Sequence, residues 1–307
     1  DANGMMIQSM RSGTIAQPGE VTGCVGCHEA RQSAPPAGNQ GPTAVTRPPV
    51  VLADWYGPPR LFSFMDEVQP VFDRHCAGCH DFGKPAGAKL LLVRDRAETF
   101  NASYTELWRR RSIAAIGAGP AETQPARSWG SHASKLVSVL RAGHHQVQLS
   151  PEEFDRIVTW IDINAPYYPT YASAFPDNLT GRCPIDPKSM QRLTELTAVP
   201  FKDLASFGAN RGPEISFDRP EKSPCLQALA AGPQPALDEA LAIIRQGAQA
   251  LASGARGDSV REGIAMCPVD QHRESFYQDR RAAEMAARQA LCAGTRVYDP
   301  GLPTPGQ

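Results

Sequence analysis

Apolar side chains recur at helical spacing along several separate stretches of the chain. The clearest stretch begins at Ser150, where serine, proline and two glutamates precede an apolar series. Serine as a cap, proline at the first helical position and glutamate at the third are typical of a helix start. The apolar positions that follow are Phe154, Ile157, Val158 and Ile161, with Trp160 beside them. We predict an amphipathic helix that ends before Pro166.

The same patterning predicts further helices on both sides of this one. They span residues 64–75, 103–116, 131–142, 187–197, 199–206, 236–253 and 270–293. Ser103 is the expected cap of the helix over 103–116, and Gly143 is expected to end the helix over 131–142. Residues 1–23 are expected to form one or two strands, 33–59 a proline-rich wrap and 167–181 an aromatic linker.

Composition narrows the classes of protein to which the chain can belong. Its 307 residues hold 31 lysines and arginines against 32 aspartates and glutamates, a formal net charge of −1. Such a balance does not predict a nucleic-acid partner. No apolar run approaches the roughly 20 residues that span a bilayer. The chain starts at Asp1 without a secretory signal, so we expect a processed product or a fragment.

Two Cys-x-x-Cys-His runs carry the strongest chemical signal. The first is Cys24, Cys27 and His28, and the second is Cys76, Cys79 and His80. This run marks covalent attachment of c-type haem, in which both thiols bind one porphyrin edge and the histidine binds the iron. A zinc ribbon would place its pairs roughly 15–20 residues apart, and a redox dithiol would accompany a βαβ pattern. Neither condition is met, so we predict two covalently bound haem c groups.

These motifs define the expected fold and its location. We predict a mainly α protein with two cytochrome-c-like haem units, loop-rich connections and a C-terminal helical region. Residues 1–60 would form the first haem-binding segment, 61–170 the second haem domain, and 171–307 the helical region with an extended tail. Covalent haem and several further cysteines suit the periplasm or another extracytoplasmic compartment.

Each haem iron has a second side that a protein ligand can close. His144 is the preferred ligand opposite His80, because two predicted helices fix it at their junction in the same unit. Weaker candidates are His75, His132 and His145. The far side of the first haem stays undecided between an open iron, a methionine and a histidine from elsewhere. A doubly ligated iron passes electrons, whereas an open one binds substrate.

Four cysteines lie outside the two motifs. They are Cys183, Cys225, Cys267 and Cys292. A helix over 270–291 is about 33 Å long at 1.5 Å per residue. It would hold Cys267 and Cys292 much farther apart than the roughly 4.4–6.8 Å that a disulfide requires between Cα atoms. We prefer the pairing Cys225–Cys267 with Cys183–Cys292, and four buried thiols are the alternative.

The segments around the motifs resemble one known family. They include IQSMRSGTIAQPGE, CVGCHEAR, VQPVFDRHCAGCHDFGKPAGAKL, GSHASKLVSVLRAGHH, LSPEEFDRIVTWIDINAP and PEISFDRPEKSPCLQAL. Together they resemble the C-terminal haem-bearing part of hydrazine synthase alpha subunits and their relatives. The resemblance implies a catalytic first haem and a relay second haem with two histidine ligands. It also implies a tyrosine ligand where this chain has Gln32, and this departure favours a relative of different function.

Two functional hypotheses follow from these features. The favoured one is a dihaem c-type cytochrome that transfers electrons outside the cytoplasm, as a subunit or fragment of a larger complex. Its partners would be other redox proteins or cytochrome subunits. The alternative is a haem-dependent oxidoreductase related to hydrazine synthase alpha, with an open first iron that acts on a small molecule. No catalytic residue is assigned, because only Glu29 and Arg31 offer acid–base chemistry beside His28.

Overall fold

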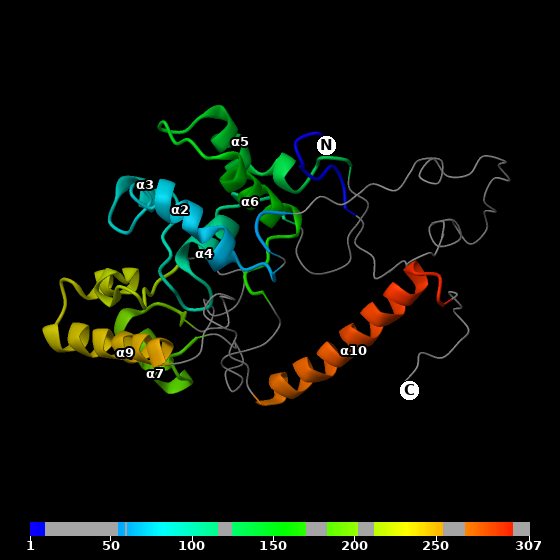
Figure 1. Cartoon of the computed structure of the whole chain (residues 1–307). Coiled ribbons are helices and arrows are strands. Elements are labelled where there is room, and N and C mark those ends of the chain that lie inside the picture. The colour runs from blue at the N-terminus through cyan, green and yellow to red at the C-terminus, as the bar shows by residue number, and fades with distance from the viewer. Residues whose placement is uncertain are drawn as a thin grey trace, which may run out of the picture. The chain divides into compact units, whose positions relative to one another are not determined.

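The computed structural model describes residues 1–9, 55–58, 60–115, 125–169, 183–201, 212–253 and 268–296. The chain divides into two compact units, one of residues 1–10 and 59–271 and the other of residues 11–58 and 272–307. In the described ranges every regular element is a helix, and a lone antiparallel bridge joins Arg96 to Asn101 (Figure 1). The expectation of a mainly helical protein is confirmed. None of the described helices is long and apolar enough to cross a membrane.

In the part of the first unit that contains the second motif, the described residues form seven short helices. They are α1 (Phe64–Glu67), α2 (Gln69–His75), α3 (Pro85–Lys89), α4 (Ala102–Arg109), η1 (Ser131–Ala133), α5 (Lys135–Ala142) and α6 (Pro151–Asp162). The helix expected over 64–75 is therefore two helices that meet at Val68. Pro70 explains the break, since proline has no N–H to donate to the preceding turn. The expected start of α6 at Ser150 is confirmed, with both hydrogen bonds of its capping box present.

Both predicted ends of the helix over 103–116 were wrong. The cap of α4 is Asn101, whose Oδ1 accepts from the N–H of Tyr104 at 3.1 Å, and not Ser103. Ser103 is instead buried and donates its hydroxyl to Gln69. The helix ends at Arg109 and not near 116, because Arg111 adopts a left-handed conformation with φ 50°. Similarly, the segment from Ser131 opens as the 3₁₀ turn η1 before α5 begins.

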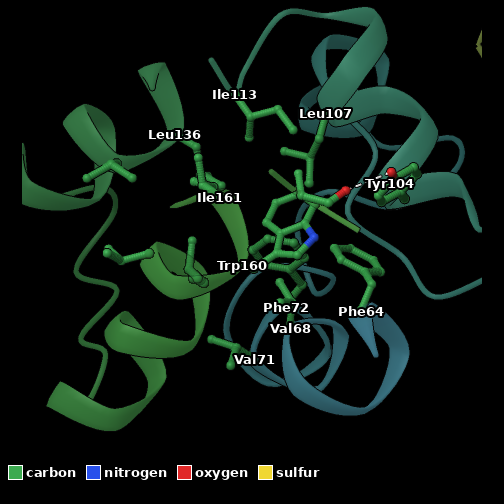
Figure 2. Close-up of a cluster of buried hydrophobic side chains, with 14 of the residues drawn as sticks. Phe64, Val68, Val71, Phe72, Tyr104, Leu107, Ile113, Leu136, Trp160 and Ile161 are labelled. Atoms are coloured by element: carbon green, nitrogen blue, oxygen red, sulfur yellow. Dashed lines mark hydrogen bonds between the residues drawn. The ribbon is translucent and has the colours of Figure 1, made fainter. Parts of the chain in front are cut away.

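One aromatic core joins these helices. Trp160 and Ile161 of α6 meet Phe64 of α1, Phe72 of α2 and Leu107 of α4 (Figure 2). All five side chains are almost completely removed from solvent. Burial of large apolar side chains contributes on the order of 1.5–3 kcal/mol each. This core therefore supports both the second motif and the turn at His144, since α2 leads into Cys76 and α6 follows that turn.

The aromatic segment after α6 belongs to this core as well. The hydroxyl of Tyr167 accepts from the N–H of Asn101 at 3.1 Å, and the carbonyl of Tyr167 accepts from the N–H of Phe64 at 3.1 Å. Its ring also stacks on Phe64. The expected linker over 167–181 therefore does not begin at Tyr167, which is a core residue. Met5 is buried in the same core, which accounts for one N-terminal methionine by packing.

A second core lies between helices farther along the same unit. Its elements are α7 (Pro187–Thr197), η2 (Pro220–Lys222), η3 (Pro224–Leu229) and α9 (Gln234–Ser253). The bounds predicted for α7 are confirmed, and α9 begins two residues before its expected start. Helices α7 and α9 lie side by side (Figure 1) and bury Leu193 and Ile244 with Phe201 and Phe217.

The segment 214–219 joins this second core to the second motif. Arg219 binds the carboxylates of Asp81 and Asp95 with four hydrogen bonds of 2.6–2.9 Å. These bonds hold the pKa of Asp81 below its usual range. Glu98 accepts the backbone N–H groups of Glu214 and Ile215 at 2.6 and 2.9 Å. Residues 214–219 therefore hold the segment after His80 in place, although they lie more than a hundred positions later in the sequence.

The described cysteines do not form the preferred disulfides. Cys292 is an exposed thiol at the end of α10 (Pro268–Cys292), while Cys183 and Cys225 are buried in the second core. The pairing Cys183–Cys292 is therefore absent, because one cysteine sits in a closed core and the other at a solvated helix end. Cys225 is also a thiol, and burial raises its pKa. Its proposed partner Cys267 lies outside the described residues.

Candidate haem site

The second motif forms a tight turn directly after α2. The N–H of Cys76 donates to the carbonyl of Phe72 at 2.8 Å, and the N–H groups of Cys79 and His80 both return to the carbonyl of Cys76. Cys76 packs half-buried against the aromatic core, whereas Cys79 is exposed. Burial, with the nearby Cys79, raises the pKa of Cys76 to about 11. The turn thus gathers both thiols and the imidazole at one end of α2.

A backbone carbonyl orients the His80 imidazole. Its Nδ1 lies 2.8 Å from the carbonyl oxygen of Leu90. Because a carbonyl only accepts, Nδ1 carries the proton and Nε2 keeps its lone pair for a metal. The N–H of Leu92 donates to the carbonyl of His80 at 3.0 Å, so two residues after α3, Leu90 and Leu92, hydrogen-bond to His80. Such an outer hydrogen bond is what fixes a metal-binding histidine in proteins.

A strained turn presents His144 at the end of α5. Gly143 caps the helix with φ 82°, a conformation that suits glycine. His145 and Gln146 follow with φ 46° and 62°, both left-handed, and the N–H of Val147 closes the turn onto the carbonyl of His144. Left-handed residues other than glycine cost roughly 1–3 kcal/mol each and cluster at functional sites. The surrounding helices α5 and α6 hold this turn in place.

The imidazoles of His80 and His144 lie close together. Their ring centroids are 6.0 Å apart and their planes differ by 39°. Two histidines on opposite sides of one metal, each bound at about 2.0–2.1 Å, have centroids about 6.4 Å apart. Burial, followed by the electrostatic effect of the neighbouring His145 and His80, lowers the pKa of His144 and favours the neutral form that binds metals. The observed centroid spacing is close to this value, and ligation of one haem iron by both rings stays a prediction.

The weaker ligand candidates have other partners. Nε2 of His75 lies 3.0 Å from Oε1 of Glu153, which also binds Arg74. Nε2 of His132 lies 3.1 Å from the carboxylate of Asp1. His145 is exposed and packs edge-on against His144, with 4.6 Å between ring centroids. None of the three is placed beside His80 as His144 is.

Glu153 links the two sides of the site. Its Oε2 accepts the N–H of Ser150 at 2.9 Å, while its Oε1 binds Arg74 and His75 next to the attachment turn. Burial alone would raise the pKa of Glu153, but hydrogen bonds from Ser150 and His75 outweigh it and hold the pKa at about 2. One carboxylate therefore ties the helix before Cys76 to the helix after His144.

The other predicted site residues lie outside the described residues. They are Cys24, Cys27 and His28, together with Gln32. In the described part of the chain no group of three or more histidine, cysteine, aspartate or glutamate side chains is arranged to hold a metal ion. At the second motif the donor set is thus two thiols and a pair of neighbouring imidazoles.

Sequence reasoning missed three supporting groups in this site. The carbonyl of Leu90 acts through the backbone, which carries no side-chain signal. Glu153 was predicted as a capping residue, and its second contact depends on how α2 packs against α6. Arg219 lies 139 positions after His80 in the sequence, and only the docked segment 214–219 brings it to Asp81.

Comparison with known proteins yields one family. A family model described as the hydrazine synthase alpha subunit middle domain matches residues 1–29. The matched stretch includes the first Cys-x-x-Cys-His run and covers less than a tenth of the chain. No curated protein and no solved structure matches the chain.

Proposed function

We propose that this chain is a dihaem c-type cytochrome that transfers electrons, as a subunit or fragment of a larger extracytoplasmic complex. The observation that carries the proposal is the close pair His80 and His144, 6.0 Å apart beside a Cys-x-x-Cys-His turn. A haem iron bound on both sides has no position for a substrate, and its chemistry is reversible one-electron transfer. The family match at residues 1–29 supports haem chemistry in a multi-subunit context.

Each residue of the second site has a defined part in this proposal. Cys76 and Cys79 would bind the porphyrin through thioethers, and His80 and His144 would bind the iron. The Leu90 carbonyl sets the tautomer of His80, and Glu153 holds the two flanking helices together. A packed aromatic core behind Cys76 excludes water and resists movement of the ligands. Residues that move little between oxidation states are what electron transfer requires of a protein.

Carbon monoxide binding to the reduced holoprotein tests the proposal. We expect no carbon monoxide at the second haem in the wild type, because His144 closes that iron. His144→Ala should open it and give a carbonyl spectrum for one haem. His145→Ala is the matched control, since His145 is exposed and adjacent, and it should leave the wild-type behaviour unchanged. Carbon monoxide binding at the second haem of the wild type would reject a doubly ligated iron.

The first motif supports a second candidate function. Its segment is the one matched by the hydrazine synthase alpha family, and the wider resemblance implies a catalytic haem there. We infer as the alternative a haem-dependent oxidoreductase in which the iron bound by His28 takes a small molecule. Rapid carbon monoxide binding at one of two irons in the wild type, unaffected by His144→Ala, would favour this alternative. Absence of binding at both irons would favour electron transfer.

The extracytoplasmic location is a separate part of the proposal. Haem attachment through two thiols is expected where the chain is exported before it folds. The test compares production of the chain with and without an added export signal. Exported chain should carry two haems by intact mass, and chain retained in the cytoplasm should carry none. Haem attachment without export would contradict the proposed location.

A further inference from the structure

Charge is unevenly distributed over the surface of the first unit. In the described residues from 60 to 150, every exposed charged side chain is basic. They are Arg74, Lys84, Lys89, Arg94, Arg110, Arg111, Arg127, Lys135 and Arg141. The aspartates and glutamates of these residues are all buried or half-buried. A chain with a formal net charge of −1 thus displays a strongly positive surface over one stretch.

Four of these basic residues lie at the second attachment turn, and we name them the basic cluster: Arg74, Lys84, Lys89 and Arg110. Arg74 is in the last turn of α2, two residues before Cys76. The ammonium of Lys84 donates to the carbonyl of Gly78, inside the motif. Arg110 donates to the carbonyl of Ala88 at 3.1 Å, next to Lys89 and two residues before the Leu90 carbonyl that orients His80.

The acidic partners of the basic cluster are turned away from solvent. Arg74 pairs with Glu153, but the arginine side chain is 65% exposed and the glutamate 12%. Arg110 pairs with Glu106, with exposures of 40% and 2%. Lys89 is exposed in the last turn of α3. An approaching molecule therefore meets mainly cationic groups, and the carboxylate of Asp81 beside Lys84 is only 21% exposed.

The same turn exposes one of its two thiols. Gly78 and Cys79 are exposed, whereas Cys76 is packed against the core. A porphyrin bound through Cys79 would therefore have its attached edge near the basic cluster. Electron transfer between proteins requires a short distance between cofactors, and complementary charge steers the encounter that provides it.

We infer that the basic cluster docks a redox partner protein whose docking face is acidic. The inference rests on the proposed electron-transfer function and names the partner class for the same site. With a haem attached at the second motif, the docked pair would exchange one electron between that haem and the partner's cofactor, one being oxidised as the other is reduced. Charge complementarity supports this occupant, because a basic or apolar partner would leave the exposed cations unpaired or desolvated.

Stopped-flow oxidation of the reduced holoprotein by hexacyanoferrate(III) tests the surface. Each haem gives one electron to one hexacyanoferrate(III), which becomes hexacyanoferrate(II). The anion should react faster at low ionic strength. The double variant Lys84→Glu, Lys89→Glu should slow the kinetic phase in which the second haem is oxidised by roughly tenfold. Lys188→Glu with Lys222→Glu makes the same change in net charge on exposed residues of the second core and should leave that phase within twofold. Equal slowing by both pairs would overturn the inference.

A competitor separates a docked polypeptide from a small anion. Poly-L-glutamate should inhibit the hexacyanoferrate(III) reaction of the wild type and not that of Lys84→Glu with Lys89→Glu. Monomeric glutamate at the same carboxylate concentration should inhibit much less. If the monomer inhibits as well as the polymer, the cluster only attracts anions and the partner inference fails.

The haem spectrum distinguishes this failure from failure of the proposed function. A colourless protein, or a second haem that does not change oxidation state, rejects electron transfer itself. A normal spectrum combined with oxidation rates that do not change in the basic-cluster variants rejects only the docking surface. Lys84→Gln with Lys89→Gln removes the charges without reversing them and should give a smaller loss, of about threefold.

Discussion

Residues 60–169 and 183–253 of the same unit are both small helical regions with a buried core, yet they differ in chemistry. The first contains five of the seven histidines, and the second has none. Exposed charges in the first are mainly basic, whereas the described residues of the second expose six acidic and four basic side chains. The packing rules are the same in both regions. The difference lies in two short turns, at Cys76–His80 and at His144–Val147, which the first core holds in place.

The largest difference between the two regions is expected when one fully buried side chain in each core is replaced by alanine. Trp160→Ala should destabilise the protein by about 3–5 kcal/mol, and Ile244→Ala by about 2–5 kcal/mol, because each removes a fully buried side chain. Only Trp160→Ala should also perturb the haem spectrum, since Trp160 lies in the core that supports both turns. Denaturant unfolding followed by haem absorbance and by far-UV circular dichroism measures both effects. If Ile244→Ala changes the haem spectrum as much as Trp160→Ala does, then the second core also supports the haem site.

The junction between the regions should make stability depend on pH. Burial raises the pKa of Glu98 to about 7, and the neighbouring Glu214 adds to this, although backbone N–H groups oppose it. A raised carboxyl pKa means that the folded state holds the proton more tightly than the unfolded state. Stability should therefore fall between about pH 4.5 and 7, by at most about 3 kcal/mol, and level off above.

Glu98→Gln provides the control for this pH effect. The amide is neutral at every pH, so the variant should lack the fall that the wild type shows. Urea unfolding at pH 5 and at pH 7.5 gives the two free energies of unfolding for each protein. If both proteins change equally, Glu98 is not the group responsible.

The link between α2 and α6 should matter more than an exposed ion pair beside it. Glu153→Gln removes the charge that Arg74 and His75 share, and we expect a loss of about 1–3 kcal/mol. A fraction of the second haem should also become able to bind carbon monoxide. Glu152→Gln is the matched control, because Glu152 is exposed and pairs with Arg156, and such pairs contribute about 0.2–1 kcal/mol. Thermal unfolding and carbon monoxide difference spectra compare the two variants. Equal effects of Glu153→Gln and Glu152→Gln would show that Glu153 has no special role at the site.

The smallest effects are expected from a pair of helix caps. Ser150 caps α6 in the first region and Asp186 caps α7 in the second, each accepting backbone N–H groups of the first turn. Alanine at either position should cost about 0.5–2 kcal/mol. Only Ser150→Ala should broaden the absorption of the second haem, because it loosens the helix after the His144 turn. Identical haem spectra in the two variants would mean that the Ser150 cap does not affect the environment of the second haem.

Local sequence signals predicted the parts of the fold that depend on local chemistry. The cap at Ser150 and the helix over 187–197 are confirmed, because capping side chains and apolar spacing act within a few residues. The ends of α4 were wrong since Asn101 competes with Ser103 as cap, and Ser103 serves a tertiary bond to Gln69. Tyr167 was placed in a linker because its burial depends on Asn101 and Phe64, which lie 66 and 103 residues earlier.

The candidate site divides in the same way. The motif residues Cys76, Cys79 and His80 are visible in sequence, and His144 was preferred from its place between two helices. The structure places His144 beside His80, although the sequence alone also offered His132 and His145. What the sequence did not predict are groups that act across the fold, namely the Leu90 carbonyl and Arg219. Their contacts exist only after the segments around them have packed.

The central claim is that His80 and His144 bind one haem iron from opposite sides. Low-temperature electron paramagnetic resonance of the oxidised protein tests it directly, by comparing wild type with His144→Ala. We predict a low-spin signal from the second haem in the wild type, its replacement by a high-spin signal in the variant, and its return when imidazole is added. An unchanged low-spin signal in His144→Ala would contradict the claim.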